Sequence, residues 1–392
     1  MVVIAPGYTS VPYYPTHDTW AAKYHRKKDV NAALPHGFPR QLSGKLVWDG
    51  EDLSLAEHTS DSGTECVLKL NDSQLAEIDA ALRHFQGLGM PMDQLNPKTF
   101  PLPSLHHVLR AVSDNLHKGY GFTMIRGIPV DNYNAEENMI IYVGVSSHIA
   151  PVRGRQNSYF NQTSEDVMVT HITNYLRSKD DDRILPAGHT DKEITFHSDI
   201  GDIVSLYALD EPVTGGESLL ASTWRLYNEI AKTRPDLIRV LADNWPMPIG
   251  TDYSVQRPLL YYLPPNSHDP ERITVQYSRR PFSEIRPKSW PITLTEEQVE
   301  ALDTIQFLCE KLAVSIQIKK GDIQFINNMS VLHGRTGYED GSKQRRHLIR
   351  LWLRDPENAW ATPSQLQSRW DKLYHSKHSN GPQAYPLEPP LH

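Results

Sequence analysis

Residues 194–202 read Ile-Thr-Phe-His-Ser-Asp-Ile-Gly-Asp, a short β-prone run that ends in a His-x-Asp pair. In an extended chain, residues i and i+2 point to the same side, so His197 and Asp199 can reach one ion. His333 follows a second β-prone run far downstream. Two histidines and one carboxylate form the facial triad of non-haem Fe(II) oxygenases, which leaves open positions on the metal. The pattern therefore predicts a metal site formed by His197, Asp199 and His333.

The His-x-Asp spacing alone is weak evidence. The chain contains a second copy, His189-Thr-Asp191, eight residues before the first. Chance explains most matches to so short a pattern, so this second pair remains an alternative at this point.

Residues 344–353, Gln-Arg-Arg-His-Leu-Ile-Arg-Leu-Trp-Leu, add a second chemical signal. Strand alternation places Arg346 and Arg350 on one face, while Arg345 has the opposite phase and is expected to face solvent. An inward-facing guanidinium on an apolar strand is costly unless an anion pairs with it. That anion is either a bound ligand or a core acid such as Glu217.

The amino-acid composition limits the kinds of molecule that this protein is expected to bind. The chain has 392 residues, with 40 basic and 47 acidic side chains and a net charge of −7. This balance argues against nucleic acid or an anionic membrane surface as partner. We see no apolar run of membrane-spanning length and no signal-peptide pattern. The two cysteines cannot form a disulfide framework, which fits a reducing compartment. We therefore expect a cytoplasmic protein that acts on a small molecule.

Short strands of irregular spacing dominate the sequence after about residue 140. Helices are predicted to begin at Asn71, Ser104, Ser222 and Thr295, where capping residues precede apolar positions at helical spacing. Short strands with few helices between them favour a mainly β fold, a jelly roll or barrel, over alternating βαβ units. The first 66 residues, rich in Pro and Tyr, predict an extended N-terminal segment that wraps this core.

Four motifs in order make the chain resemble the TauD/TfdA family of Fe(II)- and 2-oxoglutarate-dependent dioxygenases. They are Phe-His-Ser-Asp-Ile-Gly-Asp at 196–202, Gly-Gly-Glu-Ser-Leu-Leu-Ala-Ser at 215–222, His-Gly-Arg at 333–335 and Gln-Arg-Arg-His-Leu-Ile-Arg-Leu-Trp at 344–352. The resemblance covers about residues 100 to 355 and implies a double-stranded β-helix (jelly roll) with flanking helices. We divide the chain into an N-terminal extension (1–100), the dioxygenase core (101–356) and a C-terminal tail (357–392). The long terminal additions resemble fungal members linked to specialised metabolism.

The resemblance also implies roles for single residues. His197, Asp199 and His333 would bind Fe(II), which favours His197 over His189 in the Pro/Gly loop. Arg346 would bind the distal carboxylate of 2-oxoglutarate, helped by Ser218 where the family often has Thr. Arg350 matches a position that reaches the substrate anion in some members.

Other pocket residues are predicted from alternation and loop composition. Ile323 and Phe325 alternate with Gln324 before His333, so these two apolar side chains either face the iron or pack in the core. A polar run, comprising Asn157, Tyr159, Asn161 and Gln162, either contacts substrate or forms a solvated turn.

The predicted reaction is oxidation of a C–H bond in a small anionic substrate, an amino acid or related carboxylate. It would proceed by hydroxylation, oxidative cyclisation or desaturation, with Fe(II), 2-oxoglutarate and O2 used and succinate and CO2 released. The alternative is a cupin-like metalloenzyme without 2-oxoglutarate, in which Arg346 and Ser218 would have no purpose. Family resemblance is compatible with a homo-oligomer.

Overall fold

The computed structural model describes residues 10–24, 32–53, 55, 66–156, 166–175, 185–247, 255–267, 269–285, 292–375, 379 and 381–389. The polar run at 157–162 lies outside these ranges. The α-helices are α1 (His17–Tyr24), α2 (Asp72–Leu88), α3 (Leu105–Lys118), α4 (Ala135–Ile149), α5 (Thr223–Thr233), α6 (Pro235–Ala242), α7 (Glu296–Leu312) and α8 (Gln367–Tyr374). No helix in the described part of the chain has the length and apolar character needed to cross a membrane.

The strands form two principal sheets and several two-stranded ladders. The larger sheet has the order β1 (Val67–Lys69), β2 (Phe122–Arg126), β15 (Ile323–Asn327), β7 (Ile203–Asp210), β18 (His347–Arg354) and β3 (Val152–Gly154), with β5 (Thr170–Thr173) also paired to β18. The smaller sheet has the order β14 (Val314–Ile316), β9 (Ser218–Ser222), β16 (Val331–Arg335) and β6 (Ile194–His197). The ladders pair β10 (Trp245–Pro246) with β11 (Gln256–Arg257), β12 (Leu260–Leu263) with β13 (Arg272–Val275), β8 (Thr214–Gly215) with β17 (Tyr338–Glu339), and β4 (Asp166–Val167) with β19 (Gln383–Ala384).

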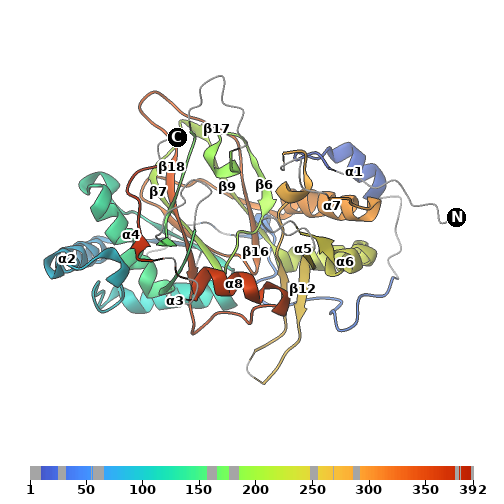
Figure 1. The fold of residues 1–392 in the computed structure, drawn as a ribbon, viewed down its shortest axis with the longest axis horizontal. Helices are drawn as coiled ribbons and strands as arrows, with labels where there is room; N and C mark the ends of the chain where they lie inside the picture. Colours follow the sequence, from blue (N-terminus) through green and yellow to red (C-terminus); the bar gives the residue numbers. More distant parts are fainter. Residues whose placement is uncertain are drawn as a thin grey trace.

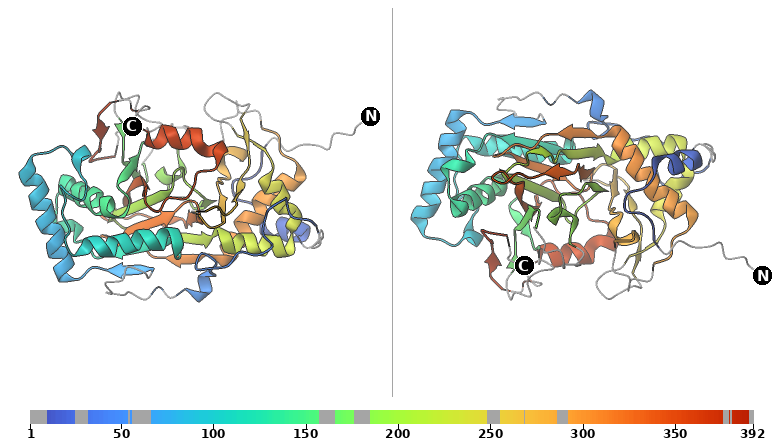
Figure 2. Two further views of the ribbon diagram at one scale, coloured as in Figure 1. Left: turned by 90° about the horizontal axis from the view of Figure 1, so that it is seen from below. Right: turned by 90° about the horizontal axis from the view of Figure 1, so that it is seen from above.

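Three hydrophobic clusters show how these sheets are layered. One cluster contains buried side chains from both sheets, such as Val204 and Ile326 from the larger and Leu220 and Val331 from the smaller. The outer face of the larger sheet packs on α2, α3 and α4, and the outer face of the smaller sheet packs on α1, α5, α6 and α7. Figures 1 and 2 show the strands between these two helical groups. The fold is therefore mainly β with helices on both sides, as expected.

The predicted helix starts agree with the structure; three of them carry a side-chain cap, whereas at Ser104 the backbone N–H donates to Glu77 instead. Asn71 and Thr295 form capping boxes with Gln74 and Gln298, and Ser222 caps α5. Each cap satisfies N–H groups that the first helical turn leaves without partners. Gly89 ends α2 in a left-handed conformation with φ of 60°, which suits glycine.

Helix α4 corrects the expectation of mostly β structure near residue 140. The apolar run from Met139 to Val145 reads as a strand because this helix is buried on nearly every side, so its sequence lacks an amphipathic pattern. Its start is nevertheless encoded, since Asn134 and Glu137 form a capping box. Helix α6 was also not predicted.

Both terminal regions are joined to the core. Near the N-terminus, Val11 pairs with Ser283, and Trp20 and Tyr24 are buried. Strand β1 belongs to the larger sheet, so the first hundred residues also supply a strand. In the C-terminal tail, buried Trp370 of α8 donates to Asp202 at 2.6 Å, so this helix is anchored to the core.

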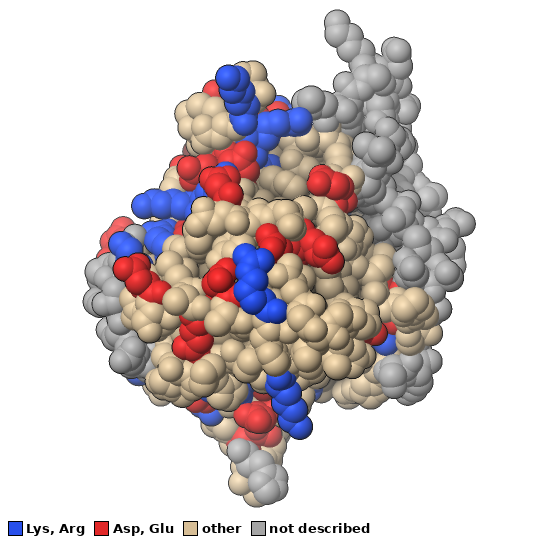
Figure 3. Space-filling view, turned by 90° about the vertical axis from the view of Figure 1, so that its left-hand side faces the viewer, with Lys and Arg blue, Asp and Glu red and all other residues tan. Residues whose placement is uncertain are grey.

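Figure 3 shows one face of the molecule, on which lysines and arginines are interspersed with acidic residues. A mixed arrangement of charges gives this face no single-sign field of the kind that attracts a polyanion. The exclusion of nucleic acid as a partner remains a prediction from composition.

Candidate metal centre and adjoining cavity

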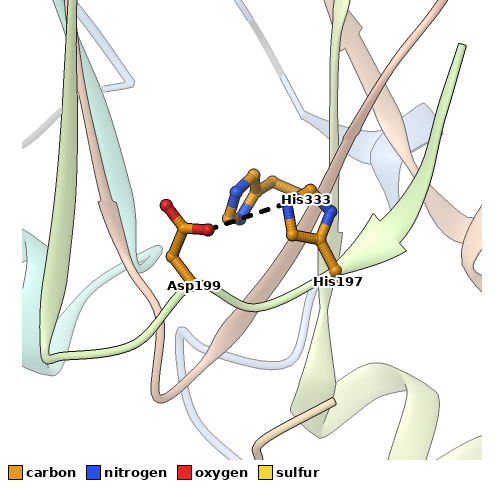
Figure 4. A group of neighbouring side chains, drawn as sticks. All are labelled: His197, Asp199 and His333. Atoms are coloured by element: carbon orange, nitrogen blue, oxygen red, sulfur yellow. Dashed lines mark ion pairs between the residues drawn. The ribbon is translucent and has the colours of Figure 1, made fainter. Parts of the chain in front are cut away.

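The smaller sheet brings the three expected ligands together. His333 on β16 is the register partner of His197 at the end of β6, and Asp199 follows in the next turn. One ligand atom from each side chain lies within 4.8 Å of the others, and no other such group of metal-ligating side chains occurs among the described residues. Figure 4 shows the three side chains converging. The alternative residue, His189, lies apart and is bonded through Nε2 to the carbonyl of His171.

The protonation states of these groups suit metal binding. His197 donates from Nδ1 to the carbonyl of Thr195 at 2.9 Å, which leaves Nε2 as the lone-pair atom facing Asp199. Burial, and next the neighbouring His197, lower the pKa of His333 to about 3, so this imidazole is neutral at physiological pH. Burial opposes the charge of Asp199, but Arg350 and other neighbours outweigh burial and lower its pKa to about 2. Two histidines and one carboxylate are a ligand set that fits Fe(II).

Asp199 is held in place by two donors on β18. Arg350 Nη1 and Trp352 Nε1 both donate to Oδ2, at 2.8 and 2.9 Å. The other oxygen, Oδ1, lies 3.8 Å from His197 Nε2 and faces the metal site. Arg350 is itself fixed by Gln156, which accepts from its Nε at 2.8 Å. Asp199 is therefore oriented to offer one oxygen to a metal.

Arg350 makes a contact that the resemblance did not imply. Its guanidinium serves the metal-ligating carboxylate, a contact that the sequence did not indicate. The side chain also lines the cavity and remains 20% exposed. A contact between Arg350 and a substrate anion therefore remains a prediction.

Arg346 has the environment of an anion-binding residue. It is 4% exposed and lines the cavity, and its Nη1 has no hydrogen-bond partner among the described residues. Glu217, the core acid considered as its partner, instead accepts a hydrogen bond from Thr336. Burial and then the charge of Arg335 lower the pKa of Arg346 to about 9, so it stays positive at neutral pH. A buried cation of this kind calls for an anion.

Ser218 and a glycine turn complete the surroundings of Arg346. Ser218 lines the same cavity, and its hydroxyl donates to Gln324 Oε1 at 2.9 Å. Gly216 has φ of 78°, and a Cβ there would lie 3.2 Å from Arg346 Nε. The Gly215-Gly216 turn thus gives the backbone room to pass close to the arginine.

The prediction that Ile323 and Phe325 face the iron is wrong. Both are fully buried in the cluster between the larger sheet and helices α2 to α4. Of the two alternatives that the alternation on β15 leaves open, packing in the core is the correct one. Gln324 points toward Ser218 and Ile326 lies between the sheets. The apolar cavity wall instead includes Val204 and Leu206 of β7.

The cavity beside the metal centre has a volume of about 710 Å³. Its lining is largely apolar, with contributions from Ile172, Leu185 and Ile318. Arginines at positions 280, 335, 346, 350 and 369 also line it. An apolar wall with several guanidinium groups suits a ligand that combines anionic and apolar parts.

Several lining or supporting residues were not predicted from the sequence. Tyr13 reaches the cavity from the N-terminal segment, where its backbone N–H donates to Glu284 at 3.0 Å. Trp352 has the same strand phase as Arg346 and Arg350, so alternation would have identified it. Gln156 and Tyr13 carry no comparable local signal, because both act through long-range contacts.

The hydrogen bond from Trp352 to Asp199 predicts a measurable contribution to metal affinity. We expect Trp352→Phe to weaken Fe(II) binding about tenfold, because loss of an outer partner leaves the ligand less well oriented. Anaerobic equilibrium dialysis measures this change. Trp360→Phe is the matched control, since Trp360 Nε1 donates to the carbonyl of His117. Equal Fe(II) affinity in the two variants would contradict the prediction.

Comparisons with known proteins agree with this geometry. The family model described as "Taurine catabolism dioxygenase TauD, TfdA family" matches residues 86–352. A taurine hydroxylase-like protein, SAT17, from Stachybotrys chartarum is 33% identical over 361 residues, covering 88% of this chain and 89% of its own length. FR-33289 synthase from Streptomyces rubellomurinus is 23% identical over 338 residues, covering 84% and 95%.

Two solved structures share the fold. Asparagine oxygenase in complex with Fe(II), hydroxyasparagine and succinate has a TM-score of 0.51 at 14% identity, and covers 76% of this chain and 98% of its own. The non-haem iron oxygenase OrfP in complex with Fe and α-ketoglutaric acid has a TM-score of 0.53 at 15% identity, and covers 74% and 94%. The cofactor set expected from the sequence agrees with these relatives. Because the family model spans most of the sequence, this chain belongs to the TauD/TfdA family of dioxygenases.

Proposed function

We propose that this protein is an Fe(II)- and 2-oxoglutarate-dependent oxygenase that oxidises a C–H bond of a small anionic substrate. The substrate would be an amino acid or related carboxylate. The oxidation would be a hydroxylation, an oxidative cyclisation or a desaturation. The observation that carries this proposal is the juxtaposition of a three-ligand metal centre with a buried cation, Arg346, in one cavity. A metalloenzyme without an anionic co-substrate would have no use for that cation.

Each of these residues would have a distinct role in the proposed reaction. His197, Asp199 and His333 would hold Fe(II), while Arg346 and Ser218 would hold the distal carboxylate of 2-oxoglutarate. Iron with 2-oxoglutarate and O2 would supply the oxidising power, with succinate and CO2 as co-products. Arg350 and Trp352 would keep Asp199 oriented, and the apolar walls of the cavity would exclude water from the reacting groups.

Two observations support the substrate class. Arg350 lies beside the metal centre and is exposed to the cavity, so it can meet an anionic group close to the iron. Two fold relatives, asparagine oxygenase and OrfP, have been solved with hydroxyasparagine and hydroxyarginine. A cavity of about 710 Å³ has room for 2-oxoglutarate and a substrate together.

The remaining structural interpretations belong to the same proposal. We infer that the two facing sheets form a double-stranded β-helix, and that residues 101–356 are its core. The cytoplasmic location and any homo-oligomeric state remain predictions from the sequence.

The decisive experiment is an anaerobic Fe(II) titration of the apoprotein with and without 2-oxoglutarate, followed by visible absorption. We expect a weak metal-to-ligand band that needs both additions. Iron binding without a band would overturn the use of 2-oxoglutarate and favour the cupin-like alternative. Candidate amino acids and carboxylates can then be screened by their effect on the band.

A further inference from the structure

We propose that Arg335 is a second arginine for the distal carboxylate of 2-oxoglutarate, so that this carboxylate lies between two guanidinium groups. The inference rests on the proposed function, because it assumes that Arg346 and Ser218 form the distal-carboxylate site. It assigns a positioning role to a residue that neither the metal centre nor the Arg346 contacts require.

The strand register places Arg335 next to the expected site. Arg335 lies two residues beyond His333 on β16 and lines the same cavity. Its partner across the ladder is Ser218 of β9. Residues directly opposite in an antiparallel pair point to the same face, with Cβ atoms about 5 Å apart. Arg335 and the Ser218 hydroxyl therefore emerge side by side on the cavity face.

Arg335 and Arg346 also share one aromatic neighbour. The guanidinium carbon of Arg335 lies 4.7 Å from the ring centroid of Tyr338, and that of Arg346 lies 5.3 Å from it. The two arginines are 5% and 4% exposed. Tyr338 thus contacts two buried cations, and burial and then the charge of Arg335 lower the pKa of Arg346.

Asp191 lies near Arg335 and Asp340 near Arg346, but neither acid forms an ion pair with these cations among the described residues. Nη1 of each arginine is buried without a hydrogen-bond partner, and neither guanidinium forms an ion pair there. Asp340, a nearby acid, accepts from the backbone N–H of Arg346 at 2.7 Å. Two adjacent buried cations with unused donors are expensive in the absence of an anion, and a carboxylate has two oxygens to satisfy both donors.

The other nitrogens of Arg335 have a structural task. Nη2 donates to the carbonyls of Thr190 and Lys192, and Nε donates to the carbonyl of Thr336. These bonds tie the loop before β6 to β16. They use only part of the guanidinium and do not cancel its charge. A test must therefore separate loop anchoring from carboxylate binding.

The experiment compares Arg335→Gln, Arg335→Lys and Arg345→Gln with the wild-type protein. Gln retains a donor for the loop carbonyls and loses the charge, and Lys retains the charge. Arg345 is the control because it is exposed and lies beside Arg346 in sequence. Anaerobic titrations give the Fe(II) Kd from dialysis and the 2-oxoglutarate Kd from the absorption band. Melting curves without ligands establish that each variant is folded.

We expect Arg335→Gln to weaken 2-oxoglutarate binding about tenfold or more, with Fe(II) affinity changed less than about twofold. Arg335→Lys should recover part of the loss, and Arg345→Gln should match wild type. Equal weakening of Fe(II) and 2-oxoglutarate would overturn the inference in favour of loop anchoring. An unchanged 2-oxoglutarate Kd would also overturn it. Absence of the band in the wild-type protein would instead defeat the proposed function itself.

Discussion

Replacing His197 with alanine is expected to abolish Fe(II) binding in the micromolar range and all oxygenase activity. The loss should exceed the roughly 10- to 100-fold that removal of an outer-shell partner costs, because a direct ligand is removed. His197 suits this test because its side chain is 21% exposed, so truncation leaves little buried space empty. Equilibrium dialysis under anaerobic conditions measures the change in Fe(II) affinity.

The second His-x-Asp pair in the chain provides the control. His189 is 3% exposed and donates from Nε2 to the carbonyl of His171. We expect His189→Asn to retain wild-type Fe(II) affinity, with any effect confined to stability. If His197→Ala bound iron and His189→Asn did not, the assignment would be reversed, and His189 would be the metal ligand in place of His197. Retention in both would remove His197 from the ligand set.

The grouping of His197, Asp199 and His333 could be predicted from the sequence because part of its geometry is local. His197 and Asp199 are two residues apart, and His333 follows a run whose β-character is evident. What the spacing could not give is the pairing of β6 with β16, which sets His333 opposite His197. That register depends on contacts between segments more than a hundred residues apart, and here the family resemblance supplied the missing information.

Strand alternation showed which residues lie on the same face of a strand. It was less reliable in showing whether that face points into the cavity or toward the helices. Arg346, directly before β18, and Arg350 on that strand fixed the phase, because guanidinium groups do not pack in an apolar layer. On β15, apolar residues lie on both faces, so pattern alone could not assign the phase. Ile323 and Phe325 consequently pack on the helices, and Gln324 supports Ser218.

The same ambiguity accounts for helix α4. A helix that is buried all round and a buried strand have similar short apolar runs, and only capping residues distinguish them locally.

Tyr13 shows a different limit of prediction from sequence. Its place in the cavity follows from the docking of the N-terminal segment near Ser283 and Glu284, which no local pattern encodes.

Replacing Arg346 with glutamine is expected to weaken 2-oxoglutarate binding by on the order of a hundredfold or more. Loss of one partner from a buried, hydrogen-bonded charge pair typically costs 2–5 kcal/mol, and Arg335 alone would then face the distal carboxylate. Fe(II) affinity without 2-oxoglutarate should be unchanged, since Arg346 contacts none of the three metal ligands. The absorption band titrated with 2-oxoglutarate measures the first effect, and anaerobic equilibrium dialysis without 2-oxoglutarate measures the second.

The stability of the apoprotein adds an independent criterion for Arg346. A residue whose main task is structural lowers the free energy of unfolding when it is removed. Arg346 is instead a buried cation beside Arg335 without an ion-pair partner in the described residues. Arg346→Gln should therefore leave the melting temperature of the ligand-free protein unchanged or raise it. The same variant should reduce the increase in melting temperature that 2-oxoglutarate and Fe(II) produce.

Arg346→Lys should restore little affinity for 2-oxoglutarate, because an ammonium group cannot reproduce a bidentate contact. A wild-type Kd for 2-oxoglutarate combined with a lower melting temperature would show that Arg346 supports the fold and that the co-substrate binds elsewhere.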